Sequence, residues 1–410
     1  MNIGVVGPYP PPYGGVSISI KQCSEVWTSK GHEVHLINFT TYKGTRMVKK
    51  VFIHDVAKKD IAGRKVFSAI SSLMRHNFKH AYPFLAHDYS LRERMGSLLM
   101  IRKVGDICKK YGIKILHSHH LSGLRSAVTC ACSKDLDKPF VVSGYGEAWR
   151  FRNNERMLNL MKRIADSATH LTATSEHCKN GMVRFLGVPP EKVSVIYAGV
   201  DTKRYNPEVD GVWLKKKYGI GDEKVLLFVG HLHPRKGPHY AIRAMPLVFR
   251  EVRDVKLLVV GPDYWGYKTE FENLASQLGA SDKVFFTGEV DEKDLPAHYA
   301  LANILVFPST TLVECMGMTL KQAMAAGIPV VGAKIGGVPE AIVDRKTGYL
   351  VRPNDEVDLA EKIVKLLKDE KLRRKMSLKG RERALKLFRK ETMAEKLLNL
   401  YERVIELRRA

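Results

Sequence analysis

The sequence predicts an α/β protein with two parallel-sheet domains, and three observations support this prediction. The chain has 410 residues, which suits two domains of ordinary size. Short runs rich in β-branched residues alternate with stretches of helical periodicity in both halves, which is typical of parallel α/β sheets. Several of these runs end in Gly, Ser or Thr before a loop, and in such sheets ligands bind at the carboxyl ends of the strands.

The expected strands form two sets, separated by a cluster of Gly, Asp, Asn and Pro at residues 198–211. We therefore assign residues 1–200 to one domain and 201–385 to the other. The expected strands of the first half are 3–7, 33–38, 115–118, 140–143, 170–174 and 193–197, and those of the second half are 225–230, 256–261, 284–287, 304–307 and 330–332.

Residues 386–410 are expected to hold a final helix, from about Lys390 to Leu407. Apolar side chains repeat there at helical spacing, so one face of the helix must be buried. They are Met393, Leu397, Leu400, Tyr401, Val404 and Ile405.

The amino-acid composition indicates the cellular compartment and the kinds of binding partner to expect. The N-terminus begins on a strand-like run without the features of an export signal, and six cysteines in a chain of this length suit a reducing compartment. We expect a cytoplasmic protein. Lys and Arg outnumber Asp and Glu by 67 to 43, giving a net charge of +24 that attracts anionic partners such as nucleic acid, lipid head groups or diphosphates.

Residues 41–80 are the most basic segment, with Asp55 and Asp60 as their only acids. Apolar side chains within the segment lie at helical spacing, and two interpretations stay open. A basic amphipathic helix can lie on an anionic membrane surface, which favours peripheral attachment to the inner membrane face and a lipid-linked acceptor. Otherwise the helix packs on the core and its basic face is solvated. The apolar residues are Val66, Phe67, Ile70, Leu73 and Met74.

Residues 308–331 carry the most chemical information. After a strand and a loop, a helix is expected to begin near Gly317 or Met318 and to end at Gly327, which suits a C-cap. The amides of its first turn and the helix dipole form a site for phosphate or diphosphate. Glu314, in the loop before the helix, can accept hydrogen bonds from sugar hydroxyls.

This stretch resembles the signature of family 4 glycosyltransferases, in which two glutamates separated by seven residues precede Ala-Met-Ala-x-Gly-x-Pro-Val-Val. The resemblance implies the GT-B fold, with two Rossmann-like domains facing a central cleft and a C-terminal helix that crosses back to the N-terminal domain. It implies that the first domain binds the acceptor and the second binds the nucleotide sugar.

The resemblance also implies roles for residues of this stretch. Glu314 takes the place of the glutamate that contacts the donor sugar in the family. Gln322 takes the place of the second glutamate, which contacts the ribose, so an amide replaces an acid there. The helix start that would bind the donor comprises Met316, Gly317, Met318 and Thr319.

Residues 228–237 resemble the family's clamp for the donor diphosphate. Lys236 matches the family lysine, whereas His231 stands where the family has an arginine. Because a histidine gives at most one donor toward a phosphate, we expect Arg235 to supply the missing charge. Taken alone, the segment also fits a surface turn with two cations.

Two elements of the first half complete the resemblance. Gly14 and Gly15 form a loop after the first strand, where the family has a Gly-Gly loop near the donor phosphate and the acceptor. His119 matches a histidine that lines the family's active site, and would hydrogen-bond the donor sugar. His117 is expected to be structural.

The expected reaction is transfer of a glycosyl group from a UDP- or GDP-sugar to a hydroxyl of a saccharide or lipid-linked acceptor, with retention implied by the family. No cofactor is expected to be obligatory, and magnesium is not required. Lys236, Arg235 and the helix start at Met318 would stabilise the leaving diphosphate instead of a metal.

Other functions stay open. A phosphorylase or synthase of the same fold would use a sugar phosphate, and His231 and Gln322 also suit a nucleotide-sugar-binding protein without catalysis. The charge suits a nucleic-acid-binding protein, but the chain has no RNA-binding aromatic-basic pattern, zinc motif or helix-turn-helix pattern. Nucleic acid is therefore not an expected partner.

Overall fold

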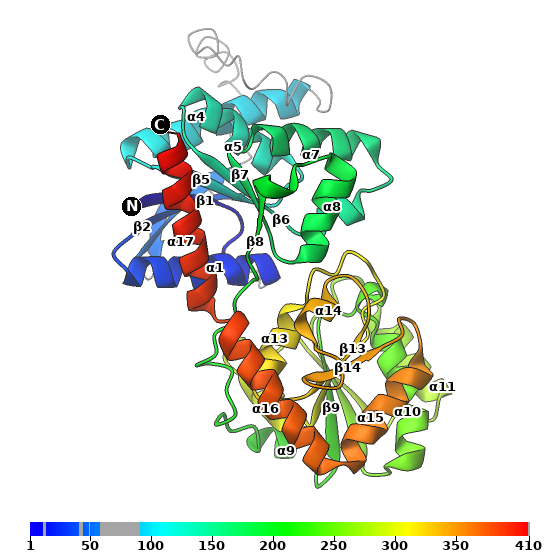
Figure 1. The fold of residues 1–410 in the computed structure, drawn as a ribbon. Helices are drawn as coiled ribbons and strands as arrows, with labels where there is room; N and C mark the ends of the chain where they lie inside the picture. The colour runs from blue at the N-terminus through cyan, green and yellow to red at the C-terminus, as the bar shows by residue number, and fades with distance from the viewer. Residues whose placement is uncertain (11–13, 41–43, 49, 58–90, 409–410) are drawn as a thin grey trace. The chain divides into compact units, whose positions relative to one another are not determined.

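The chain forms two compact units in a computed structural model, which describes residues 1–10, 14–40, 44–48, 50–57 and 91–408 (Figure 1). One unit comprises Met1–Ala198 and Lys390–Ala410, and the other comprises Gly199–Arg389. The division therefore falls two residues before the predicted one. Residues 386–389, which the sequence analysis assigned to the last helix, belong to the second unit.

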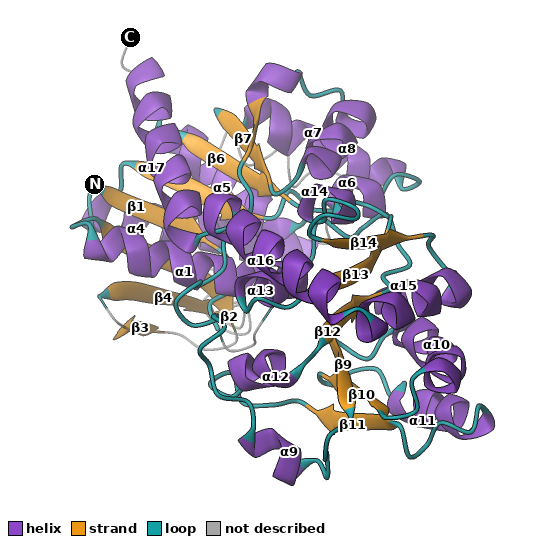
Figure 2. Cartoon of the chain, turned by 60° about the horizontal axis from the view of Figure 1, so that its bottom comes forward, coloured by secondary structure: helices purple, strands orange, loops and turns teal. Residues whose placement is uncertain are grey.

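The first unit is built on a sheet with the strand order β3-β4-β2-β1-β5-β6-β7-β8 in its described part. All neighbouring strands are parallel except β3 and β4, which pair antiparallel at the edge (Figure 2). The six strands predicted in this half are confirmed to within two residues at each end. The strands are β1 (Asn2–Val6), β2 (Glu33–Thr40), β3 (Gly44–Val48), β4 (Val51–Ala57), β5 (Ile115–His119), β6 (Phe140–Gly144), β7 (His170–Ala173) and β8 (Val193–Val195).

The β3–β4 hairpin was not predicted, and it occupies part of the basic segment 41–80. The apolar residues expected to form an amphipathic helix in this segment, 66–74, lie outside the described residues. Within the described part of the chain, no helix is long and apolar enough to cross a membrane.

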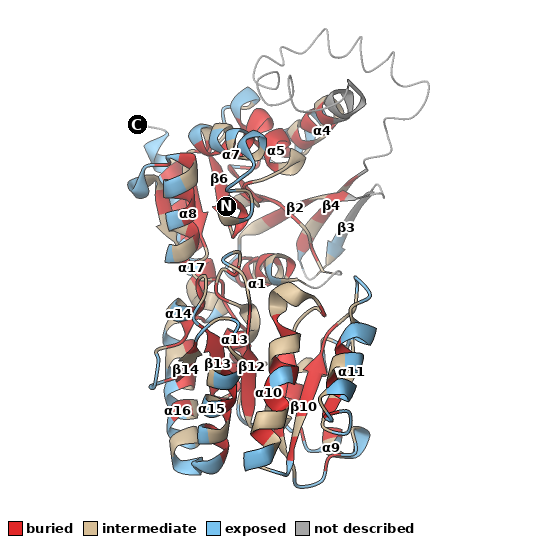
Figure 3. Ribbon diagram, turned by 90° about the vertical axis from the view of Figure 1, so that its right-hand side faces the viewer, coloured by how far each residue is buried: buried red, intermediate tan, exposed pale blue. Residues whose placement is uncertain are grey.

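Helices cover the sheet of the first unit, so its central strands are buried along their whole length (Figure 3). This burial explains the nearly continuous apolar runs of these strands, which are typical of parallel sheets with both faces covered. The helices are α1 (Gly15–Ser29), α4 (Leu91–Lys110), α5 (Leu124–Asp135), α6 (Glu147–Arg150), α7 (Glu155–Ser167), α8 (Glu176–Leu186), the short 3-10 helix η2 (Pro190–Lys192) and α17 (Lys390–Leu407).

The last helix, α17, packs against α1 although nearly the whole chain separates them in sequence (Figure 1). The Trp27 indole N–H of α1 donates to the Ala394 carbonyl at 2.9 Å, and its ring meets the Tyr401 ring edge-on. Met393, Leu397 and Tyr401 are buried, as their spacing predicted. The predicted return of the final helix to the N-terminal domain is therefore confirmed.

The second unit contains a parallel sheet with the order β11-β10-β9-β12-β13-β14. Its five predicted strands are confirmed, and β14 is an additional edge strand. The strands are β9 (Lys224–Val229), β10 (Val255–Val260), β11 (Val284–Gly288), β12 (Ile304–Phe307), β13 (Val330–Ala333) and β14 (Gly348–Val351). The helices are α9 (Trp213–Lys217), the short 3-10 helix η3 (Pro234–Lys236), α10 (Pro238–Glu251), α11 (Lys268–Gln277), α12 (Leu295–Leu301), α13 (Met318–Ala325), α14 (Val338–Ala341), α15 (Glu356–Lys368) and α16 (Glu370–Leu387).

Candidate functional site

An ion pair lies at the carboxyl edge of the second unit's sheet. Lys236 follows β9 and Glu314 follows β12, and these two strands are neighbours. The Lys236 ammonium Nζ lies 2.6 Å from Oε2 of Glu314, whose side chain is 8% exposed. The structure therefore brings together the two residues that the sequence analysis placed in the clamp and at the sugar position, 78 residues apart in the chain.

Close backbone packing fixes the position of this pair. Gly237 has a left-handed φ of +76°, and a Cβ atom there would lie 1.8 Å from the Pro308 carbonyl oxygen. On the other side of the loop, Gly336 has a φ of +56°, and a Cβ would lie 2.2 Å from the Glu314 carbonyl oxygen. Only glycine allows both approaches. Gly237 places the Lys236 loop against Pro308 of the Glu314 loop, and Gly336 places the loop after β13 against Glu314.

Hydrogen bonds reinforce the contact between the two loops. The Thr310 N–H and the Ser309 hydroxyl both donate to the Arg235 carbonyl, at 3.1 and 3.2 Å. The Ser309 hydroxyl also lies 3.4 Å from Oε2 of Glu314. These hydrogen bonds join the two loops at the edge of the sheet, where Arg235 and Lys236 remain partly exposed.

Glu314 is held as a carboxylate. Burial by itself would raise its pKa, but the Lys236 ammonium, the Arg235 guanidinium and the Ser309 hydroxyl together hold the pKa below its ordinary value. The ionised carboxylate is an acceptor only, so it can receive hydrogen bonds from several hydroxyl groups.

The helix expected after Glu314 is α13, which begins at Met318 as predicted. Gly317 caps it with a φ of +77°, no side chain caps the first turn, and no acidic residue lies in that turn. Gly327, just beyond the helix, has the left-handed φ of +75° that the sequence predicted for a C-terminal cap. The positive end of α13 can therefore meet an anion beside Lys236.

The four residues predicted at the helix start differ in their surroundings. Met316 is buried, so its side chain is part of the core, whereas Gly317, Met318 and Thr319 are partly exposed. The Thr319 hydroxyl oxygen is buried and has no hydrogen-bond partner among the described residues. A bound ligand would satisfy it, because buried polar atoms are normally hydrogen-bonded.

His231 lies at the end of β9, but its ring packs among aromatic side chains. It meets the Tyr264 ring edge-on at 5.1 Å and the Trp265 ring at 5.6 Å between centroids. Partial burial, and then the Lys236 and Arg235 charges, lower the pKa of His231. The imidazole is neutral near pH 7 and adds no charge to the clamp.

Gln322 is 4% exposed and is engaged within the protein. Its Oε1 accepts a hydrogen bond of 2.8 Å from the Tyr299 hydroxyl of α12. The amide group of Gln322 keeps donors for a ligand, while its carbonyl oxygen is shared with Tyr299. The family resemblance implies a ribose contact for Gln322, and no motif indicates the contact with Tyr299.

Lys321 was missed by the sequence analysis. It is 2% exposed on α13, and burial lowers its pKa to about 8, while Cys315 and Glu314 act in the opposite direction. Lysines are almost never fully buried without a partner. The sequence could have indicated this buried lysine, because it lies between Leu320 and Gln322 in a helix that is otherwise expected to be buried.

In the first unit, His119 lies at the carboxyl end of β5 and is 4% exposed. Its Nδ1 lies 2.8 Å from the Tyr145 hydroxyl, and its Nε2 is buried with no partner among the described residues. Burial, followed by the proximity of His117 and His120, lowers the pKa of His119 well below its ordinary value. A neutral imidazole with one open nitrogen suits a hydrogen bond to a ligand.

His117 has the structural position that was expected. Its Nδ1 lies 2.5 Å from the Tyr401 hydroxyl of α17, and its Nε2 lies 2.8 Å from the Ser143 hydroxyl. Burial lowers its pKa to about 3, so it is neutral. His117 thus connects the last helix to the strand that carries His119.

Gly14 and Gly15 lie at the start of α1, with Gly14 as the N-cap. Gly14 has an extended backbone with a φ of −152°, and a Cβ on Gly15 would meet no atom within 4 Å. Neither glycine has a positive φ. The Gly14 N–H donates to the Ser17 hydroxyl at 2.9 Å.

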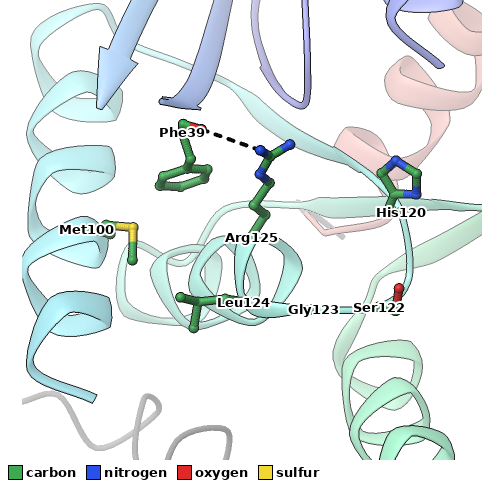
Figure 4. A pocket seen from close by; sticks show the side chains of 7 residues that line it. All are labelled: Phe39, Met100, His120, Ser122, Gly123, Leu124 and Arg125. Carbon is green, nitrogen blue, oxygen red and sulfur yellow. Dashed lines mark hydrogen bonds between the residues drawn. The ribbon is translucent and has the colours of Figure 1, made fainter. Parts of the chain in front are cut away.

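A pocket of about 300 Å³ opens beside His120 in the first unit (Figure 4). Phe39 and Met100 form an apolar wall, and the start of α5 forms the floor. The Arg125 guanidinium donates to the Phe39 carbonyl at 3.4 Å, and burial lowers its pKa. The pocket therefore combines apolar surface with one cationic group. Among the described residues, no three His, Cys, Asp or Glu side chains form a metal-binding group.

Comparison with known families agrees with this architecture. Residues 13–204 match the model of "Glycosyltransferase Family 4", and residues 214–383 match that of "Glycosyl transferases group 1". The two matches divide the chain at nearly the same place as the structure does.

Named relatives are also similar to the chain. A GDP-mannose-dependent alpha-(1-6)-phosphatidylinositol monomannoside mannosyltransferase from Mycolicibacterium smegmatis is 32% identical over 61% of this chain and 66% of the relative. The chain thus spans slightly under two thirds of that relative. N-acetyl-alpha-D-glucosaminyl L-malate synthase from Bacillus anthracis is 25% identical over 96% of this chain and 94% of the relative.

Solved structures show the same fold. Sucrose-phosphate synthase from Thermosynechococcus elongatus has a TM-score of 0.77 at 21% identity, covering 99% of both chains. Anabaena HepE in complex with UDP-glucose has a TM-score of 0.78 at 18% identity, covering 98% of this chain and 99% of HepE. With its two parallel-sheet units, its returning helix and its paired family matches, the chain belongs to the family 4 glycosyltransferases and has their GT-B fold.

Proposed function

We propose that the chain transfers a glycosyl group from a UDP- or GDP-sugar to an acceptor hydroxyl. The observation that carries this proposal is the Lys236–Glu314 pair beside the open start of α13. Together these groups offer a carboxylate for sugar hydroxyls and positive donors for a diphosphate, a combination that suits a nucleotide sugar.

The main catalytic demand is the negative charge that develops on the leaving diphosphate. Lys236, Arg235 and the first turn of α13 supply preorganised positive groups at that position. The bond between the anomeric carbon and the diphosphate oxygen breaks, and a bond from that carbon to the acceptor oxygen forms. We propose that the acceptor proton passes to the leaving diphosphate on the same face, which gives retention and needs no metal.

The acceptor is proposed to bind at the first unit. There His119 has a nitrogen with no partner among the described residues, and the next residue, His120, lines the pocket that contains Arg125. An acceptor with a phosphate or carboxylate group suits Arg125. The names of two relatives refer to a phosphatidylinositol monomannoside and to malate, which are anionic. With the basic segment 41–80, they support a cytoplasmic enzyme that acts on a lipid-linked acceptor at the inner membrane face.

A second candidate function is nucleotide-sugar binding without turnover. It is favoured by the neutral His231 where the family has an arginine, and by Gln322 where the family has a glutamate. A measurement of turnover separates this candidate from the enzyme.

Ligand binding is tested with a thermal-shift panel of nucleoside diphosphates and nucleotide sugars, since a bound ligand raises the melting temperature by mass action. Transfer from the radiolabelled form of the stabilising donor is then measured in EDTA. We expect stabilisation by a UDP or GDP compound and turnover without a metal. Stabilisation without turnover on any acceptor would support the binding protein.

Glu314→Ala tests the site itself. Loss of the buried carboxylate removes the sugar contact, and we expect turnover to fall by about 100-fold or more. Glu223→Ala is the matched control, because Glu223 forms an ion pair of 2.9 Å with Lys256 at the amino ends of β9 and β10. Normal turnover in Glu314→Ala would refute the site.

A further inference from the structure

A buried carboxylate in the first unit contacts a histidine that lines the pocket. Glu147 follows β6 as the first residue of α6, and its side chain is 9% exposed. Its Oε1 lies 3.0 Å from Nδ1 of His120, whose side chain is 39% exposed. His120 lines the pocket together with Ser122 and Arg125 (Figure 4). A buried acid is therefore in contact with a partly exposed ring at a ligand-sized space.

The other bonds of this carboxylate determine which partner donates in the contact with His120. The Leu121 N–H donates to Oε1 of Glu147 at 3.2 Å, and the Tyr145 N–H donates to Oε2. Because both oxygens act as acceptors, the His120 ring is the donor, through a proton on Nδ1. In the neutral ring this proton leaves Nε2 as a hydrogen-bond acceptor, and Nε2 has no hydrogen-bond partner among the described residues.

The backbone at His120 is strained. Its φ is +106°, a value that residues with a side chain rarely adopt. The surrounding structure holds this conformation, because the His120 N–H donates to the Ser143 carbonyl at 3.0 Å and its carbonyl accepts from the Ser126 hydroxyl. Glycine would adopt this backbone at a lower cost. Strain that the surroundings hold in place is concentrated at functional sites, so a histidine here indicates a side chain with a role.

Glu147 is also connected to the second histidine of this edge. Tyr145, whose N–H donates to Glu147, has its hydroxyl 2.8 Å from Nδ1 of His119. The Tyr145 ring lies 5.3 Å from the His120 ring between centroids. Both histidines thus use Nδ1 within the protein, and the Nε2 of each lacks a partner among the described residues.

A purely structural interpretation treats Glu147 as a link between the loops after β5 and β6. The two bonds from backbone N–H groups are sufficient for such a link. They do not require contact with a partly exposed ring, and they do not explain a strained backbone at the residue that carries this ring. These two observations favour a role for Glu147 in orienting His120.

We infer that Glu147 is a positioning residue that orients His120, so that Nε2 accepts a hydrogen bond from a hydroxyl group of the acceptor. The inference rests on the proposed function, because it assigns a role within the proposed acceptor pocket. Arg125 binds the anionic group of the same acceptor. The proton of the reacting hydroxyl still leaves with the diphosphate, and Glu147 acts only through His120.

The tautomer of His120 tests the orienting role without any ligand. Heteronuclear NMR of the full chain with labelled histidines is recorded at about pH 8.5, where free histidine is neutral. His120→Asn identifies the signal, and its Nδ2 can still donate to Glu147. We expect the Nδ1–H form in wild type and mainly the Nε2–H form in Glu147→Ala. A wild-type ring with its proton on Nε2 would overturn the inference.

Transfer to acceptors that combine hydroxyl and anionic groups tests the role in binding. The acceptors are L-malate, inositol phosphate and phosphatidylinositol in mixed micelles, and the donor is the stabilising nucleotide sugar. We expect kcat/KM for the acceptor to fall about ten-fold in His120→Asn and in Glu147→Ala. Glu147→Gln should recover part of the loss, because its amide oxygen can accept from Nδ1.

The double variant His120→Asn/Glu147→Ala separates positioning from support of the fold. Its kcat/KM should lie within about two-fold of that of His120→Asn, because Glu147 has no ring to orient once the imidazole is absent. Glu155→Ala is the matched control, since Glu155 is also the first residue of a helix in this unit but is exposed. Melting temperatures show whether each variant is folded.

The outcomes separate this inference from the proposed function. Losses that multiply to about 100-fold in the double variant would overturn the inference, because Glu147 would then act independently of His120. Unchanged kcat/KM in His120→Asn would also overturn it. Wild-type protein that transfers to none of the acceptors would count against the proposed function, whereas the tautomer would still decide whether Glu147 orients His120.

Discussion

The two units present opposite chemistry at the carboxyl edges of their sheets. In the first unit, His117 and His119 are buried and neutral, and they are held by neutral hydroxyl groups. In the second unit, Lys236 and Glu314 form an ion pair of 2.6 Å. The same architecture therefore holds His117 and His119 by neutral hydrogen bonds in one unit and Lys236 and Glu314 by paired charge in the other.

The difference shows two ways in which polar side chains at the carboxyl edge of a sheet can be buried without a large energetic cost. Burial of an ion without a partner costs several kcal/mol, and in the second unit the nearly buried Glu314 carboxylate is paired with Lys236. The histidines of the first unit avoid this cost because they lose their proton. If the proposed function holds, electrostatic stabilisation of the leaving group comes from the second unit, and the first unit orients its ligand.

Among the substitutions that test this difference between the two units, Lys236→Ala should reduce turnover the most. Removal of the ammonium deletes a donor at the diphosphate and leaves Glu314 buried without its partner, and we expect a loss of turnover of about 100- to 1000-fold. The measurement is kcat with the donor identified by the panel. Lys256→Ala controls for loss of an ion-paired lysine of the same unit, and equal activity of both variants would remove Lys236 from the site.

His119→Ala should have a smaller effect that is independent of pH. The variant loses one hydrogen bond from a neutral imidazole, and we expect kcat/KM to fall about ten-fold relative to wild type. Because the pKa of His119 lies well below its ordinary value, this ratio should be the same at pH 6 and pH 8. A ratio that changed between these values would indicate that His119 titrates there.

His170→Gln is the control for the His119 experiment. His170 lies at the amino end of β7, and its Nε2 is 2.9 Å from the Ser194 hydroxyl. We expect activity close to that of wild type from this variant.

Gln322→Glu should produce the smallest effect, with nucleotide affinity between unchanged and about five-fold tighter. A carboxylate can still accept the Tyr299 hydroxyl, and it gives a ribose hydroxyl a charge-assisted bond. Calorimetry with UDP and GDP measures the change. Clearly weaker binding would argue against a ribose contact at this position.

Local patterns in the sequence predicted most of the fold. The eleven expected strands are present because each is a β-branched run with clear ends, and α17 begins and ends at the predicted residues. The β3–β4 hairpin was missed because lysines at positions 43, 49 and 50 obscure the alternation of its strands. β14 was missed because its run, Gly-Tyr-Leu-Val, contains a single β-branched residue.

The sequence predicted a contact between site residues when a family motif contains both residues and their strands are neighbours. Lys236 and Glu314 meet because their strands are neighbours, and the family pattern contains both residues. The contacts of His231 with Tyr264 and of Gln322 with Tyr299 could not be predicted, because they depend on tertiary packing between residues 23 to 33 positions apart with no motif to connect them.

The return of α17 to the first unit makes that unit discontinuous in the chain. The second unit is one continuous segment, Gly199–Arg389, so it can complete its fold during synthesis while the first unit still lacks a helix. Trp27 and His117 acquire their partners Ala394 and Tyr401 only when the last helix has been made. The contact between the last helix and β5, the strand that carries His119, therefore forms only after the whole second unit has been synthesised.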